Sequence, residues 1–281
     1  MNPSATAHPY RDFELAGWER AALAYAETFE SATRLYADDL LDAVQLQPGA
    51  DLLDIACGTG YLTELALERG AVVVGTDFSA AMLAEAARLH PSIRFEQADA
   101  EALHYPDERF DVAVINFGVH HFPFPERALS EACRVLRRGG RIAFTVWSTP
   151  DEHTLHGIAL EAVRAAGSLG ASLPVPPHGG LNTLERCMSL LTAAGLEPDG
   201  QRSGLVRRTL RLASVTDLIH LIESGTVRLA SLLRSQPAAS RAAILRGLET
   251  AAARYQNQGD LELPVAAVLA VARRPVERDD A

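Results

Sequence analysis

Apolar residues follow two patterns in the first half of the chain. Over residues 13–46 they recur at three- and four-residue steps, which is typical of amphipathic helices. Short apolar runs then alternate with helical patterns. The expected strands are 52–56, 71–76, 93–97, 110–115 and 141–147, and the helical patterns between them are 61–69, 79–89 and 125–137. Strands that are apolar throughout and alternate with helices predict an α/β fold, with a parallel sheet covered on both faces.

The pattern changes after Pro150. Helices are expected at 152–168 and 181–194, a loop at 173–180 and a strand at 203–212. An Ala- and Leu-rich helical stretch at 214–256, interrupted at Pro237, precedes a last strand at 263–273. We expect residues 214–256 to be an insertion between the last two strands, forming a lid over a crevice at the carboxyl edge of the sheet.

Charge narrows the class of partner. The 281 residues include 26 Lys and Arg and 36 Asp and Glu, for a net charge of −10. Nucleic acid or an anionic membrane would need clustered basic residues. The basic cluster Arg202, Arg207, Arg208 and Arg211 has the spacing of the exposed face of an edge strand. We therefore expect neither nucleic acid nor a membrane as partner.

Cysteines and terminal segments give no sign of export. Cys57, Cys133 and Cys187 have no metal-finger spacing and suggest no disulfide framework. The first residues lack the pattern of a signal peptide, and no apolar run approaches the ~18 residues of a membrane span. A cytoplasmic location is expected.

One turn carries most of the chemical information. The run Asp54-Ile55-Ala56-Cys57-Gly58-Thr59-Gly60 follows a predicted strand and opens a helix. Glycines in such a turn let the backbone approach a ligand closely. Asp77, at the end of the second strand, can accept two hydrogen bonds from a ribose diol. A dinucleotide would fit almost as well, but Thr63 stands where the third glycine of G-x-G-x-x-G belongs, which disfavours NAD.

These residues resemble the first motif of the class I S-adenosylmethionine-dependent methyltransferases, in particular small-molecule enzymes of type 11 or 25. GTDFSAAML at 75–83 resembles their second motif, and QADAEALHYPDERFDVAV at 97–114 their third. Residues 116–147 resemble the fourth motif with its helix and the Gly-Gly turn before strand five. The resemblance covers about residues 15–150, and Ala56 stands where many relatives carry glycine.

The resemblance implies a fold and a domain plan. It implies a Rossmann-like, mostly parallel sheet of seven strands in the order 3-2-1-4-5-7-6, with the last strand antiparallel. Residues 1–46 would form a helical segment over the cofactor, 47–150 the cofactor-binding core, and 151–274 the remaining strands with the lid at about 214–256. Residues 275–281 would be a frayed tail.

The cofactor implied is S-adenosylmethionine, with S-adenosylhomocysteine as product and no metal. Asp77 would bind ribose, Phe78 pack on adenine, Asp99 and Ala100 lie near the adenine amine, and Asp54 order the glycine loop or a water. Tyr25 and Phe29 would close over the methionine part, or serve only as core aromatics. The cofactor-binding set is Tyr25, Phe29, Asp54, Ala56, Gly58, Gly60, Asp77, Phe78, Met82, Asp99, Ala100 and Asn116.

Two adjacent histidines follow strand four, at the edge where acceptors are handled in open α/β sheets. His120 or His121 could deprotonate a phenol or enol, because histidine titrates near neutrality. They point differently, so at most one should face the acceptor. The alternative is that both only pack, since methyl transfer to a nucleophilic atom needs mainly alignment and desolvation.

The sequence thus predicts an enzyme that transfers a methyl group to a small, partly apolar acceptor, on oxygen, nitrogen or carbon. One alternative is a homologue that binds the cofactor without methylating, such as a cyclase or a regulatory binder. Another is an NAD-dependent oxidoreductase. The oligomeric state is open, a homodimer being one option.

Overall fold

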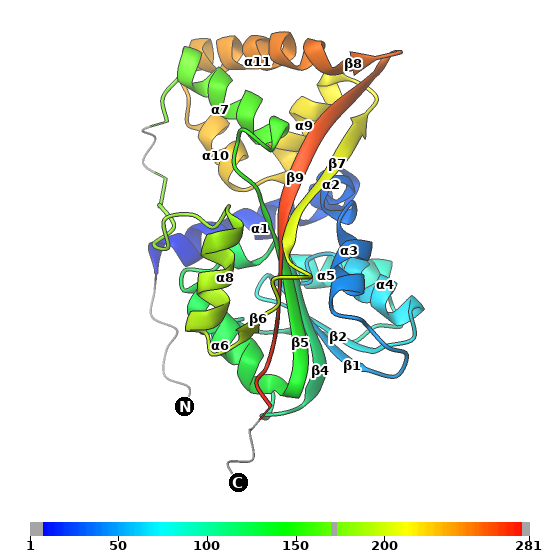
Figure 1. The fold of residues 1–281 in the computed structure, drawn as a ribbon. Helices are drawn as coiled ribbons and strands as arrows, with labels where there is room; N and C mark the ends of the chain where they lie inside the picture. Colours follow the sequence, from blue (N-terminus) through cyan, green and yellow to red (C-terminus); the bar gives the residue numbers. More distant parts are fainter. Residues whose placement is uncertain (1–7, 170–172, 277–281) are drawn as a thin grey trace.

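A single twisted sheet runs through the computed structural model, which describes residues 8–169 and 173–276 (Figure 1). Its strand order is β3-β2-β1-β4-β5-β9-β6. The strands are β1 (Asp51–Ile55), β2 (Val72–Asp77), β3 (Phe95–Gln97), β4 (Phe110–Asn116), β5 (Leu136–Trp147), β6 (Glu197–Pro198), β7 (Gly204–Leu212), β8 (Gln256–Asn257) and β9 (Asp260–Arg273). The first five strands pair in parallel, whereas β9 is antiparallel to β5. The expected α/β fold and strand order are confirmed.

The expected strand at 203–212 is present as β7, and a short additional strand, β6, precedes it. Both β6 and β7 pair with β9, separated by a turn in which the Asp199 carboxylate accepts from the backbone amides of Gln201 and Arg202. Together with the short β8 this gives nine strands in the described part of the chain rather than seven. The arginines of this edge are all in ion pairs: Arg202 with Asp199, Arg207 with Glu152, Arg208 with Asp39 and Arg211 with Glu262.

The helices are shorter than the sequence pattern indicated. Those before and between the parallel strands are α1 (Pro9–Glu27), α2 (Glu30–Arg34), α3 (Ala37–Ala43), α4 (Tyr61–Glu68), α5 (Ala80–Leu89) and α6 (Pro125–Val135). The later ones are α7 (Thr154–Ala166), α8 (Leu184–Ala193), α9 (Val215–Gly225), α10 (Arg228–Arg234) and α11 (Ala238–Ala252). The segment 13–46 is thus three helices, because Thr28 leaves helical geometry (φ −129°, ψ −81°) between α1 and α2, and Tyr36 (φ −115°, ψ 0°) does so between α2 and α3.

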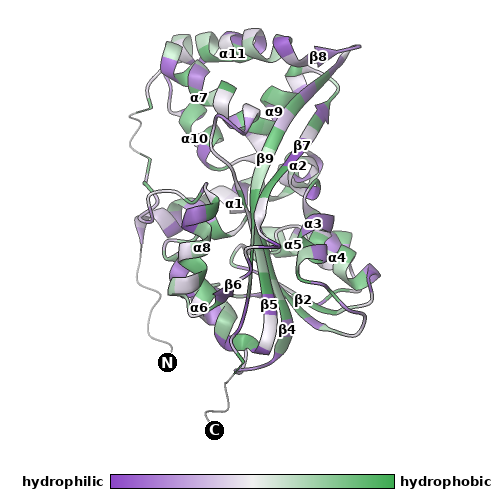
Figure 2. Cartoon of the chain, in the orientation of Figure 1, coloured by the Kyte–Doolittle hydropathy of each residue, from purple (hydrophilic) through white to green (hydrophobic). Residues whose placement is uncertain are grey.

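Both faces of the sheet are packed. On one face α6 and α8 cover residues such as Ile115 and Phe144, and on the other α3 and α4 cover Leu52 and Val114. Figure 2 shows hydrophobic colour along the central strands and hydrophilic colour at the tip where β8 turns into β9. Two-sided burial explains why the parallel strands are apolar without alternation.

A second core lies beyond the carboxyl edge of the sheet. The distal halves of β7 and β9 extend past the parallel strands, and α7, α9, α10 and α11 gather around them (Figure 1). Leu221 and Ile222 of α9 and Ile244 and Leu248 of α11 are buried in this cluster. The extended parts of β7 and β9 therefore carry the helical region 214–256, which connects them, as a packed layer with its own core.

Strand β5 begins at Leu136, whereas the sequence predicted a start at residue 141. The pair Gly139-Gly140 therefore lies inside the strand. A Cβ on Gly140 would come within 2.8 Å of the Arg137 carbonyl oxygen, and Gly139 has φ +76°, so both positions favour glycine.

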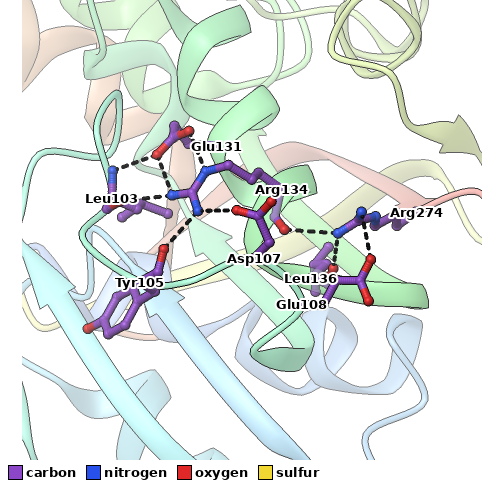
Figure 3. A network of polar contacts seen from close by, with 8 residues as sticks. All are labelled: Leu103, Tyr105, Asp107, Glu108, Glu131, Arg134, Leu136 and Arg274. Carbon is purple, nitrogen blue, oxygen red and sulfur yellow. Dashed lines mark hydrogen bonds and ion pairs between the residues drawn. The ribbon is translucent and has the colours of Figure 1, made fainter.

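Two arginines, Arg134 and Arg274, hold the segments around the start of β5 together (Figure 3). Arg134 donates to the carbonyls of Leu103 and Tyr105 and pairs with Glu131 and Asp107. Arg274 donates to the carbonyls of Arg134 and Leu136, which ties the end of β9 to the start of β5.

Candidate active site

The glycine-rich turn joins the carboxyl end of β1 to α4. Ala56, Gly58 and Gly60 all have positive φ, at +57°, +55° and +86°. A Cβ on Gly60 would lie 2.6 Å from the Phe95 ring, whereas Gly58 has open space on that side. Gly60 is therefore needed for packing, and Gly58 leaves room beside the backbone. The left-handed conformation of Ala56 costs any residue with a Cβ atom of order 1 kcal/mol. Glycine adopts this conformation without that cost, which explains why glycine would also suit position 56.

Asp54 lies beneath this turn and does not reach the crevice. It is 1% exposed, and its Oδ2 accepts a hydrogen bond of 2.7 Å from Thr63 Oγ1 of α4. Burial raises the pKa of Asp54 to about 7. The contact joins the first turn of α4 to β1, so Asp54 orders the turn from below.

Asp77 stands at the carboxyl end of β2 and faces the crevice. Its Oδ2 accepts from the Gly58 amide at 3.0 Å and its Oδ1 from the Ser79 amide at 2.9 Å. Each carboxylate oxygen can accept a further hydrogen bond. Burial raises the pKa of Asp77 to about 6. The two amides fix a carboxylate that still has two acceptor positions for a diol.

A narrow crevice follows the carboxyl ends of β1, β2 and β4. Its two parts, of about 80 and 20 Å³, share Ala56, Asp77, Phe78 and His121. Tyr25, Phe29, Gly58, Met82 and Asn116 line the first part, and Asp99 and Ala100 line the second. The predicted cofactor residues thus come together along one crevice, except Asp54 and Gly60, which support it from behind.

Helix α1 closes one side of this crevice. Arg11 pairs with Asp99 at 2.8 Å, and the ring of Trp18 meets that of His121 edge-on, with centroids 5.0 Å apart. Glu14 pairs with His121, as described below. Sequence reasoning missed Tyr10, Arg11 and Glu14, although Tyr10, Glu14 and Trp18 recur at four-residue steps and therefore share one helix face.

The two histidines have unlike surroundings on the 3-10 helix η1 (Val119–His121). The backbone oxygen of His120 accepts from the Tyr10 hydroxyl at 2.9 Å and from His178 Nε2 at 3.3 Å. The His120 side chain is half-buried, its buried Nδ1 has no partner among the described residues, and desolvation holds the pKa of the ring well below its ordinary value. His121 instead has its Nδ1 2.9 Å from Glu14 Oε2.

A larger cavity of about 340 Å³ adjoins the crevice. Trp18, Phe29 and His121 line both spaces, and Trp147 forms a further shared wall. Trp147 is fixed between the rings of Phe117 and His153, which stack on it at 3.9 and 4.5 Å. The cavity has aromatic walls, and its polar lining includes Glu14, His120, His156 and His178.

The expected lid contributes only part of its length to this cavity. Residues 225–229 and Leu232, where α9 meets α10, line it, whereas α11 packs on α7 away from it. Burial lowers the pKa of His153 to about 2 and that of His156 to about 4. No group of three or more metal-ligating side chains occurs in residues 8–169 and 173–276.

Comparison with known proteins agrees with the motif reading. Residues 53–144 match the model of a methyltransferase domain family. The demethylmenaquinone methyltransferase of Renibacterium salmoninarum is 39% identical over 118 residues, which are 42% of this chain and 50% of the relative. The chain therefore spans about half the length of the curated relatives it matches. The resemblance to methyltransferases that the motifs indicated is confirmed over residues 53–144.

Solved structures share the fold over a longer stretch. The YcgJ protein from Bacillus subtilis superposes with a TM-score of 0.58 at 19% identity, over 87% of this chain and all of that one. A [4+2]-cyclase gives a TM-score of 0.50 at 24% identity, over 88% of this chain and 82% of that one. At such identities the likeness establishes the fold and leaves the reaction to be argued from the site.

Proposed function

We propose that this chain, whose residues 53–144 match a methyltransferase domain family, transfers the methyl group of S-adenosylmethionine to a small, partly apolar acceptor. The observation that carries the proposal is that the Asp77 crevice and the larger aromatic cavity share Trp18, Phe29, His121 and Trp147. A donor in the crevice and an acceptor in the cavity would meet at these residues.

The residues of the crevice fit the cofactor. Asp77 offers two acceptor positions for the ribose hydroxyls, and Phe78 and Met82 give an apolar surface for adenine. Asp99, now paired with Arg11, would exchange that contact for the adenine amine. Tyr25, hydrogen-bonded to Thr33 at 2.9 Å, and Phe29 would cover the methionine part. The bound cofactor supplies an electrophilic methyl group, and the protein's part is to align the acceptor and exclude water.

The acceptor is best described by the cavity. Its volume of about 340 Å³ and its walls of Trp18, Phe29 and Trp147 suit a planar, largely apolar ring. Of its lining residues, only His120 and His121 lie within the matched segment 53–144. The relatives' names make demethylmenaquinone a compound to test, but most residues of the cavity belong to the part of the chain that the family model does not cover.

Two other functions are less well supported. An NAD-dependent oxidoreductase would carry glycine at position 63, where the Thr63 side chain is instead bonded to Asp54. A non-methylating homologue would bind the cofactor in the same crevice, so binding alone does not separate it from the enzyme. Transfer of labelled methyl separates the two.

The helices and the surface charges bear on the protein's partners and on its location in the cell. Within the described residues no helix has the length and apolar character needed to cross a membrane. Nucleic acid is not proposed, because the four arginines of the β7 edge are engaged by carboxylates. A cytoplasmic location and a homodimer stay proposals, to be checked by cell fractionation and light scattering.

Titration calorimetry with the full chain tests the cofactor assignment. S-adenosylmethionine and S-adenosylhomocysteine should bind at a single site, and NAD should give no binding heat. Binding of NAD in place of the sulfonium cofactor would overturn the assignment.

A further inference from the structure

Glu14 and His121 form a buried pair between two distant parts of the chain. Glu14 lies on α1 and is 1% exposed, and its Oε2 is 2.9 Å from His121 Nδ1, across 107 positions of sequence. The other oxygen, Oε1, has no hydrogen-bond partner among the described residues. Both side chains line the larger cavity, and His121 also lines the crevice. The pair thus lies where donor and acceptor would meet.

A carboxylate at Nδ1 determines what the rest of the ring can do. It accepts the Nδ1 proton and so fixes the tautomer in which Nε2 carries the lone pair. It also stabilises the imidazolium that forms when Nε2 takes up a proton. In the described chain Nε2 of His121 makes no hydrogen bond. Burying an acidic side chain with an unpaired oxygen is costly, so this placement needs a compensating use.

The other histidines of the cavity lack this arrangement. His120 has no carboxylate beside it, and burial lowers its pKa, as it does for His156 and His178. Tyr10 donates to the His120 backbone oxygen, and Arg11 is held by Asp99. Among the described side chains around the cavity, His121 is the imidazole with a carboxylate to receive its Nδ1 proton.

We propose that Glu14 is the positioning residue of a general base, His121, and that the acceptor therefore carries a weakly acidic hydroxyl on a planar, largely apolar ring, as in a phenol or an enol. This inference rests on the proposed function and names its substrate class. The aromatic walls select the ring, and the pair removes the proton that makes its oxygen a poor nucleophile.

The step balances without any further reactant. The acceptor's O–H bond breaks, its proton goes to His121 Nε2, and the electron pair stays on oxygen. The electron pair on the acceptor oxygen then forms the new O–C bond to the methyl carbon. The C–S bond breaks at the same time and its electrons remain on sulfur, which becomes a neutral thioether. The imidazolium, paired with Glu14, afterwards releases the proton to solvent.

Nitrogen NMR of the imidazole tests the pair without any acceptor. The experiment uses the full chain labelled with ¹⁵N-histidine and saturated with S-adenosylhomocysteine, with His121→Gln to assign the signals. We expect protonated Nδ1 and unprotonated Nε2 in the parent and in the control Asp12→Asn, an exposed site on the same helix. Glu14→Leu and Glu14→Ala remove the acceptor of the Nδ1 proton, so each should change this tautomer. An unchanged His121 signal in a folded Glu14 variant would refute the claim that Glu14 fixes the tautomer of His121.

Two probe acceptors test whether the Glu14–His121 pair acts as a general base. 1-Naphthol must lose its proton during the reaction, whereas 4-nitrophenol can be supplied already ionised. Glu14→Gln should lower kcat for 1-naphthol by about tenfold to a hundredfold, and change kcat for 4-nitrophenolate by less than about twofold. Equal losses with both probes would mean that Glu14 only supports the structure, and no loss with either would refute the base. A parent enzyme that binds the cofactor but methylates neither probe overturns the acceptor class, whereas failure to bind the cofactor overturns the proposed function itself.

Discussion

Thr63 donates a 2.7 Å hydrogen bond to Asp54 at the helix position where a dinucleotide-binding turn would have its third glycine. Both side chains are buried, and the bond joins α4 to β1 directly beneath the glycine turn. The residue that disfavours NAD is therefore also the residue that fixes the crevice.

This contact predicts a stability effect. Thr63→Val keeps the side-chain shape but leaves Asp54 Oδ2 without its hydroxyl donor, so the free energy of unfolding should fall by about 1–3 kcal/mol. Thr192→Val, at an exposed position of α8, should change it by less than about 0.5 kcal/mol. Urea denaturation of both variants measures the difference, and equal effects would contradict the assigned role.

Asp77 should dominate cofactor affinity. Asp77→Ala removes a charged acceptor of two ribose hydrogen bonds, so binding of S-adenosylhomocysteine should weaken by about 2–4 kcal/mol. Because this carboxylate also holds the Gly58 and Ser79 amides, circular dichroism must first establish that the variant is folded. Unchanged affinity by calorimetry in a folded variant would refute the ribose assignment.

The raised pKa of Asp77, about 6, predicts a pH dependence of binding. The ribose hydroxyls donate to the ionised form, so affinity should be full above pH 6 and fall as the carboxyl takes up a proton below it. The stability effect has the opposite sense: burial of Asp77 favours its protonated form, so its contribution diminishes as pH rises from about 4 through 6. Asp77→Asn should remove the part of the binding profile that depends on this group, and a profile identical to the parent's would show that another group titrates.

His120 and His121 should contribute unequally to turnover. His121→Ala removes the imidazole that Glu14 holds at the junction of the two cavities, so turnover should fall by about a hundredfold or more while cofactor still binds. His120→Ala removes a neutral ring, whereas the His120 contacts to Tyr10 and His178 are made by its backbone oxygen. Its turnover should stay within about tenfold of the parent. Equal turnover in both variants would contradict general-base catalysis here.

The helical region 214–256 should divide into two dynamic parts. The α9–α10 junction lines the cavity, so its amides should exchange quickly in the empty protein and slowly when cofactor and acceptor are bound. Helix α11 packs on α7, so its exchange should change little. Uniformly strong protection of residues 225–232 in the empty, monomeric protein would exclude a mobile lid.

The sequence predicted the part of the site that depends on backbone motifs. The turn after β1 and Asp77 after β2 are fixed by local geometry, so their spacing sufficed to bring them together. Glu14 could not be found this way, because a carboxylate on a helix ordinarily faces solvent, and its burial beside His121 depends on how α1 packs in the folded chain. The division of the helical region also escaped prediction, since it depends on how far β7 and β9 extend beyond the sheet. The predicted tail reaches past residue 276, so most of it lies outside the described residues.

The measurement that tests the central claim most directly is methyl transfer itself. The full chain is incubated with methyl-labelled S-adenosylmethionine and a small-molecule extract, and the products are identified by mass spectrometry. The account predicts a labelled aromatic product in the parent reaction, strongly reduced with folded Asp77→Ala. Cofactor binding without any labelled product, across extracts and the phenolic probes, would contradict it and favour a non-methylating homologue.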